Sequence, residues 1–163
     1  MYQSDRSENP DLIEDVEQFH DKFKLEKRLL NTPVDPDLMK VRIRFLAEEL
    51  KEVNKAAAEG DLEEVLDGLV DLVYVAVGTA FLFNLDFPNA WKNVQEANMA
   101  KVQASADNPG KRGYARDIVK PPGWKKPDHA QLFTPTDWQH PPLMTLPDPG
   151  HEGLVDLPTY FKA

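Results

Sequence analysis

Acidic side chains cluster in two neighbouring segments of this sequence, at spacings that could bind a divalent cation. The first segment, AEELKEV, has three glutamates within five positions, and the second, LEEVLDGLVDLVYV, has acids three and four residues apart. On an α-helix these spacings place side chains on one face. The candidate metal ligands are Glu48, Glu49, Glu52, Glu64, Asp67 and Asp71.

An acidic run on a helix is usually a solvated face, and EELKE alone fits that interpretation. Asp71 favours a ligand role, because the segment that follows it, LVYVAVGTAFLF, is apolar around the whole helix circumference and predicts a buried helix. A carboxylate entering such a helix needs a partner, and no Lys or Arg occurs between Lys55 and Lys92. A bound cation would supply that partner and would also relieve the repulsion between the clustered acids. Oxygen ligands without Cys or His suit Mg²⁺ or Mn²⁺.

Apolar residues that recur three and four positions apart predict an all-α fold, an antiparallel helical bundle with a metal-binding hairpin. No strand is expected, and the four expected helices are residues 11–30, 36–59, 62–85 and 89–104. Asn9 should cap the first helix, Asp35 or Asp37 the second, and Asp61 the third. The second and third helices would then form the hairpin that carries the acids.

Proline and basic residues divide the rest of the chain. Residues 1–104 are expected to form the all-α core, and residues 105–133 a basic loop that completes the site. Most of the 14 prolines lie from Pro109 onward. Residues 134–163 are therefore expected to form a proline-rich tail, which packs on its own or a neighbouring subunit.

Composition excludes several classes of function. The 163 residues include no cysteine, so disulfides and thiolate chemistry are excluded, and the net charge of −9 opposes binding to a nucleic-acid polymer. The N-terminal residues lack the order of a signal peptide, and the longest apolar run is too short to span a membrane. We therefore expect a soluble, cytoplasmic protein with no membrane partner.

The order of short motifs resembles the MazG-type all-α nucleoside triphosphate pyrophosphohydrolases. EExxE occupies residues 48–52, and four further segments match a phage and Cof-like branch of that family: FH at 19–20, DLxYV at 71–75, NxxK at 98–101 and KPxGW at 120–124. The resemblance covers residues 11–133. One departure concerns the second acidic motif, ExxD, because Gly68 stands three residues before Asp71. Asp67, or in reserve Glu64, would replace the usual glutamate.

The resemblance implies hydrolysis of a (deoxy)nucleoside triphosphate to the monophosphate and pyrophosphate, with dGTP or dUTP favoured, to control a nucleotide pool. It also implies two or more Mg²⁺ ions on the carboxylates, for which Mn²⁺ can substitute, and Glu48 or Glu49 as the base that activates water. Candidate substrate contacts are Asn98, Lys101, Lys120, Arg112, His20 and Trp124. We expect a homodimer or homotetramer, as in the family, located in the host cytoplasm if a phage encodes the chain.

Two other classes of protein are considered. A catalytically weak nucleotide-binding or helical interaction protein with the same fold is the alternative, favoured by the Gly68 departure, and hydrolysis with free Mg²⁺ would discriminate the two. A phosphatase of the HAD type is excluded, because the sequence lacks the DxDx[TV] motif.

Overall fold

The structure is a computed structural model that describes residues 11–29, 35–105, 108, 110 and 117–132. The described residues fall into two compact units, the first comprising residues 11–87 and the second residues 88–132. Three expectations lie outside the described residues: the cap at Asn9, the phosphate contact at Arg112 and the packing of the tail at 134–163.

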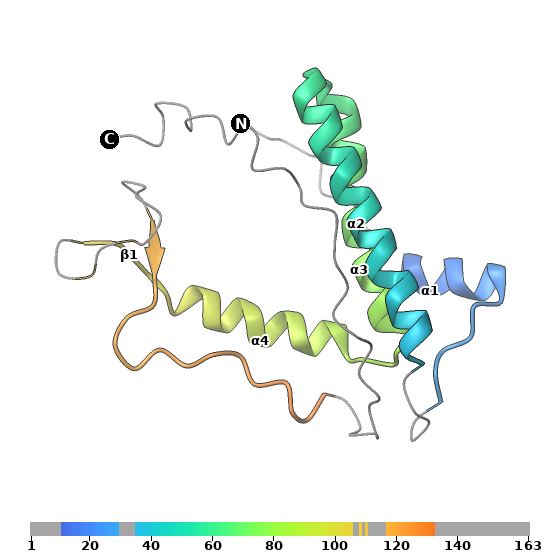
Figure 1. Cartoon of the computed structure of the whole chain (residues 1–163). Helices are drawn as coiled ribbons and strands as arrows, with labels where there is room; N and C mark the ends of the chain where they lie inside the picture. The colour runs from blue at the N-terminus through green and yellow to red at the C-terminus, as the bar shows by residue number, and fades with distance from the viewer. Residues whose placement is uncertain (1–10, 30–34, 106–107, 109, 111–116, 133–163) are drawn as a thin grey trace. The chain divides into compact units, whose positions relative to one another are not determined.

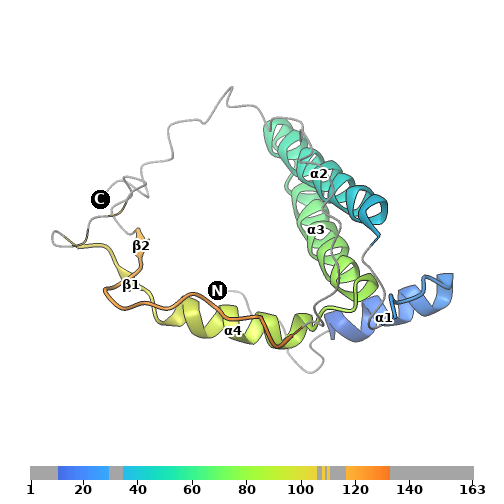
Figure 2. The same ribbon diagram turned by 60° about the horizontal axis from the view of Figure 1, so that its bottom comes forward.

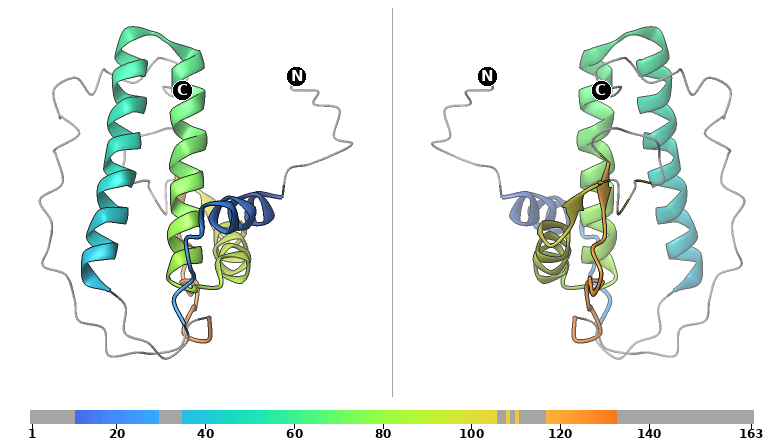
Figure 3. Two further views of the ribbon diagram at one scale, coloured as in Figure 1. Left: turned by 90° about the vertical axis from the view of Figure 1, so that its right-hand side faces the viewer. Right: turned by 90° about the vertical axis from the view of Figure 1, so that its left-hand side faces the viewer.

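The first unit contains three helices, α1 (Leu12–Phe23), α2 (Pro36–Glu59) and α3 (Leu62–Leu82). Helices α2 and α3 lie side by side as an antiparallel hairpin, and α1 crosses α3 (Figures 1 and 3). Contacts join α3 to both other helices, so α3 is the central element of this unit. The predicted hairpin of the second and third helices is therefore present.

Capping residues determine where the hairpin helices begin and end. Asp35 accepts hydrogen bonds from the N–H groups of the first turn of α2, and Asp61 does the same for α3. Gly60 ends α2 with a left-handed backbone at φ 75°, a conformation that glycine adopts without steric cost. These ends agree with the sequence prediction, except that α3 stops at Leu82, three residues before the expected end.

The first helix is shorter than predicted. Its N-cap is Asp11, and it ends at Phe23 because Lys24 has a left-handed backbone, at φ 56°. The following segment is not helical and returns to the C-terminal end of α3. There the Arg28 N–H donates to Leu82 O at 2.9 Å. The Arg28 side chain donates through Nε to Phe83 O at 3.1 Å.

The core of the first unit forms where α1 and α2 meet α3. Its buried apolar residues are Val16, Ala56, Val77, Ala80, Leu82 and Phe83. Most of these belong to the second half of α3 or the residue after it, so the hydrophobic contacts concentrate away from the acidic first half. Burial of these side chains holds the hairpin together.

One face of α3 is exposed, mostly before the segment 72–83 that was predicted to be buried, in which Val73 is the one exposed residue. Five large apolar side chains on this face are between 46% and 81% exposed: Leu62, Leu66, Leu69, Val70 and Val73. Their spacing places them along one stripe. Length and composition alone would also allow α3 to cross a membrane, although here the helix packs against α1 and α2. A contiguous apolar stripe of this kind marks an interaction surface.

The second unit begins within the first turn of α4 (Phe87–Met99) and adds two short strands, β1 (Val102–Gln103) and β2 (Ile118–Val119). The strands pair antiparallel, with Val102 opposite Val119. They correct the expectation of no strand, and α4 ends five residues before the predicted boundary at 104. Two paired residues are too few to give the alternating pattern by which a sequence indicates a strand.

Residues 120–132 run alongside α4 (Figure 2). Two hydrogen bonds fasten this segment. The indole Nε1 of Trp124 donates to Ala97 O at 2.8 Å, and Asn93 Nδ2 donates to Asp128 O at 2.6 Å. Trp124 thereby satisfies a carbonyl in the last turn of α4. Most of the described residues lie in helices, which confirms the all-α class predicted from the sequence.

Candidate metal and nucleotide site

Five carboxylates from α2 and α3 form one electrostatic cluster centred on Glu49. Partial burial raises the pKa of Glu49 above its ordinary value, and the charges of Asp71, Glu52, Glu48 and Asp67 raise it further, in that order. The two helices therefore bring their acids within electrostatic reach of one another. We call these five residues the carboxylate cluster.

Gly68 allows α2 and α3 to approach closely beside the carboxylate cluster. A Cβ atom at this buried position would lie 2.7 Å from Cγ2 of Val53 on α2, closer than two nonbonded carbons approach. The position three residues before Asp71 thus faces the helix contact. The larger glutamate of the usual ExxD motif would push the helices apart here, which gives the sequence departure a physical reason.

The exposure of Asp71 corrects one step of the sequence argument. Asp71 was expected to need a partner because it enters a buried helix, but its side chain is exposed in the single chain. Burial therefore does not require a counter-ion at this position. The repulsion between Asp71 and Glu49 remains, and this repulsion is the evidence in favour of a cation.

The donor atoms of the carboxylate cluster suit a hard divalent cation, because all of them are carboxylate oxygens. Among the described residues, however, no three acidic or histidine side chains stand close enough together to hold an ion as they are. Four of the five members of the carboxylate cluster are exposed.

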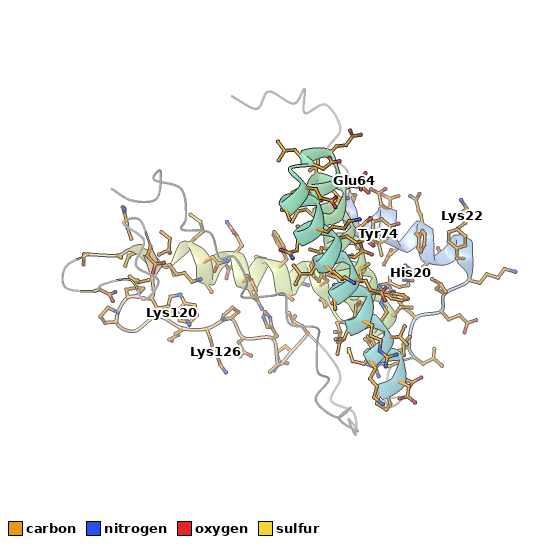
Figure 4. The ribbon with its side chains drawn as sticks, turned by 45° about the horizontal axis from the view of Figure 1, so that its top comes forward. His20, Lys22, Glu64, Tyr74, Lys120 and Lys126 are labelled. Carbon is orange, nitrogen blue, oxygen red and sulfur yellow. The ribbon has the colours of Figure 1, made fainter. Side chains whose placement is uncertain are left out.

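Glu64, the reserve ligand, lies apart from the carboxylate cluster. It lines a groove of about 490 Å³ together with Glu48 and Glu52, and it is not among the charges that raise the pKa of Glu49. Figure 4 shows Glu64 toward the loop end of the hairpin and Tyr74 and His20 further along it. The charge of Asp67 therefore acts on Glu49, whereas that of Glu64 does not.

His20 is packed inside the first unit and is not presented to the carboxylate cluster. Its ring is 2% exposed, its Nδ1 lies 2.8 Å from Val16 O, and its centroid lies 4.6 Å from that of Phe81. Its Nε2 is buried without a hydrogen-bond partner. A Cβ at Gly78 would come 3.0 Å from the ring, so the glycine makes room for the imidazole. In this arrangement His20 is a core histidine.

The remaining described substrate candidates gather in the second unit. Lys101 Nζ donates to Asn98 Oδ1 at 2.8 Å, and the ammonium of Lys120 lies 4.4 Å from the centre of the Trp124 ring. Trp124 borders a groove of about 590 Å³ between α4 and residues 121–128, and Figure 4 shows Lys120 on the segment that follows α4. Two cations, an amide and an indole thus lie near the C-terminal end of α4.

Sequence analysis overlooked Arg42, which joins α2 to α3. Its Nε donates to Thr79 Oγ1 at 3.0 Å and its Nη2 donates to Val75 O at 2.9 Å, and burial lowers the pKa of its guanidinium group. Arg42 lies seven residues before Glu49 and so shares its helix face. The seven-residue spacing to Glu49 is the feature of the sequence from which Arg42 could have been predicted. The two hydrogen bonds help to fix the register in which Glu49 comes near Asp71.

The sequence pattern of the phosphoribosyl-ATP pyrophosphohydrolase family matches residues 16–98, just over half of the chain and all five members of the carboxylate cluster. The chain therefore belongs to this MazG-like family of pyrophosphohydrolases, which act on acid anhydrides. The family is generally Mg²⁺-dependent. No curated protein matches the chain.

Proposed function

We propose that this chain hydrolyses a (deoxy)nucleoside triphosphate between its α- and β-phosphates, releases the monophosphate and pyrophosphate, and so adjusts a nucleotide pool. The observation that carries the proposal is the carboxylate cluster, in which four charges from two helices raise the pKa of Glu49. A triphosphate carries several negative charges itself, so such a site can accept it only together with cations.

The carboxylates would have two roles. Mg²⁺ or Mn²⁺, two or more ions per site, would neutralise the triphosphate and polarise its phosphoryl oxygens, and the proposed ligands are Glu49, Glu52, Asp67, Asp71, Glu48 and Glu64. Glu49 or Glu48 would accept the proton of the attacking water.

The second unit would supply contacts to the substrate. Lys101 and Lys120 offer ammonium groups, Asn98 offers an amide, and Trp124 offers an indole ring. Arg112 completes the proposed set, whereas His20 is enclosed in the core of the first unit. The substrates that we favour are dGTP and dUTP, in line with the resemblance to the phage branch.

Self-association is part of this proposal. The apolar stripe of α3 supports a homodimer or homotetramer, because burying it against a second copy would remove several large apolar side chains from water. The protein would act in the cytoplasm, and in the host cytoplasm if a phage encodes it.

One assay tests the reaction and the base preference together. Purified protein with Mg²⁺ is incubated with each canonical NTP and dNTP, with dUTP and with phosphoribosyl-ATP, and pyrophosphate and orthophosphate are measured separately. The variants Glu49→Gln and Asp71→Asn are run in parallel. We expect pyrophosphate from one or a few substrates, without orthophosphate, and its loss in both variants.

The alternative is a catalytically weak nucleotide-binding or helical interaction protein, favoured by Gly68 in place of the usual glutamate. If every triphosphate stays intact while Mg²⁺ still raises the melting temperature of the wild type and not of the two variants, the metal site stands. The enzymatic proposal then gives way to this alternative.

A further inference from the structure

The groove beside the carboxylate cluster contains two basic residues that the site has not used. It has a volume of about 490 Å³ and runs along α2 to the first turn of α3, where its lining residues are Glu48, Lys51, Glu52, Lys55, Ala56, Glu59 and Glu64. Glu48 and Glu52 also belong to the carboxylate cluster. The groove is therefore continuous with the proposed metal site.

Lys51 and Lys55 project from the same face of α2, because they are four residues apart. Both are exposed, and neither forms an ion pair or hydrogen bond with another described residue. Carboxylates stand three residues before each of them, at Glu48 and Glu52. Lys40 uses that same spacing on α2 to bond Asp37 at 2.7 Å. The two ammonium groups in the groove remain available to a ligand.

The charges in the groove determine which ligand fits. Its four glutamates and two lysines give a net charge of −2, from 2 − 4, so a free anion would be repelled. Divalent cations bound to the shared glutamates would reverse that sign. The lysines would then complete a site for a highly charged anion that arrives with metal. A phosphate chain has that character, whereas a nucleoside does not.

On the other side of the carboxylate cluster, the hairpin surface is aromatic rather than charged. Beyond Asp71, toward the C-terminal end of α3, lies Tyr74, whose ring contacts that of Phe19 edge to face at 5.6 Å between centroids. Phe19 is 40% exposed. Glu64 and Tyr74 are ten residues apart on α3, which is ~15 Å along the helix axis. Charged and aromatic surfaces thus lie on opposite sides of the carboxylate cluster.

We infer that Lys51 and Lys55 bind the β- and γ-phosphates of the substrate, and the pyrophosphate that leaves, so that the nucleotide lies along the hairpin with its nucleoside toward α1. This inference rests on the proposed function. It adds two residues to the site and gives the substrate a direction.

The experiment is a calorimetric titration of the full chain, in Mg²⁺, with inorganic pyrophosphate and separately with dUMP and dGMP. The proteins are the wild type, Lys51→Gln, Lys55→Gln, the double variant and the two arginine variants. Lys40→Gln is the matched control, because it removes the same charge from the same helix outside the groove. Product inhibition of hydrolysis by pyrophosphate is measured in parallel.

Each glutamine variant is expected to weaken pyrophosphate binding about threefold to fivefold, the effect of losing one exposed charge-assisted contact. Arginine should restore the affinity, Lys40→Gln should keep it, and binding of the monophosphates should stay within about twofold in every variant. The inference is overturned if the wild type does not bind pyrophosphate or if the double variant binds it as tightly. If the lysine variants lost affinity for the monophosphates and for pyrophosphate equally, the proposed direction of the substrate would be wrong.

Failure of the inference can be told apart from failure of the proposed function. If the double variant still releases pyrophosphate from a triphosphate and binds pyrophosphate with unchanged affinity, the proposed function stands and the lysines have no role in it. If the wild type hydrolyses no triphosphate, the proposed function fails, while the pyrophosphate titration still decides whether the groove binds the anion.

Discussion

Removing the charge of Glu49 should stabilise the metal-free protein and destabilise the Mg²⁺-bound protein relative to wild type. Four neighbouring carboxylates act on Glu49. Exposed charge pairs are worth about 0.2–1 kcal/mol each, and at 0.3–0.5 kcal/mol a pair the four sum to roughly 1–2 kcal/mol. For a chain of this length, that corresponds to a rise in Tm of about 2–8 °C. Glu49→Gln keeps the shape of the side chain and removes only the charge.

Mg²⁺ should reverse the order of the two proteins. A ligand present at about a hundred times its Kd stabilises the folded state by ~2.7 kcal/mol, which exceeds the roughly 1–2 kcal/mol that the variant gains without metal. The variant has lost one ligand and gains less from Mg²⁺. The assay is thermal unfolding in EDTA and in millimolar Mg²⁺. Glu63→Gln is the control, because Glu63 lies on the same hairpin outside the carboxylate cluster and should change Tm little in either buffer. In EDTA, about 1 M salt should remove most of the gain, since the Debye length is then ~3 Å.

The pH dependence has a defined sign. The folded-state pKa of Glu49 lies above its ordinary value, so between the two pKa values the folded protein holds a proton that the unfolded chain releases. Stability from this group is therefore present below the unfolded pKa and is lost as pH rises through the folded pKa. The stability advantage of Glu49→Gln in EDTA should grow across that window. No advantage of Glu49→Gln in EDTA at neutral pH, or an equal gain in Glu63→Gln, would refute the reasoning.

Three further outcomes are expected. Gly68→Ala should lower the free energy of unfolding by about 1–3 kcal/mol in urea denaturation, because its Cβ would meet Val53 at 2.7 Å. Adding Val53→Ala should recover most of that loss. A single variant as stable as wild type would contradict the close helix contact. Asp67→Asn should abolish the Mg²⁺-induced rise in Tm more fully than Glu64→Gln, and the reverse order would make Glu64 the second-motif ligand. Trp124→Phe keeps a ring but loses one hydrogen bond to α4. Unfolding followed by far-UV circular dichroism should therefore show a free energy of unfolding lower by about 1 kcal/mol. An unchanged melting curve would show that this hydrogen bond does not stabilise the fold.

Local signals in the sequence were sufficient for the two hairpin helices, apart from the C-terminal end of α3. The spacing of apolar residues, the aspartates at 35 and 61 and the glycine at 60 are effects of neighbouring residues on one another, and the ends of α2 agree with them. The same kind of signal predicted that acids of α2 and α3 share helix faces. Family membership likewise followed from the order of motifs along the chain.

Contacts between distant residues decided the rest. Only the packing of α3 reveals that Gly68 faces Val53, that Arg42 bonds to Val75 and Thr79, and that His20 is enclosed. The exposure of Asp71 was mispredicted for the same reason, because an apolar sequence shows that a helix face avoids water but not which partner covers it. The paired strands and the end of α1 at Lys24 likewise depend on interactions that no local pattern records. The sequence by itself determined the helices and the identity of the acids. The tertiary structure decided which acids come within electrostatic reach of one another, because that reach depends on how closely the two helices can approach.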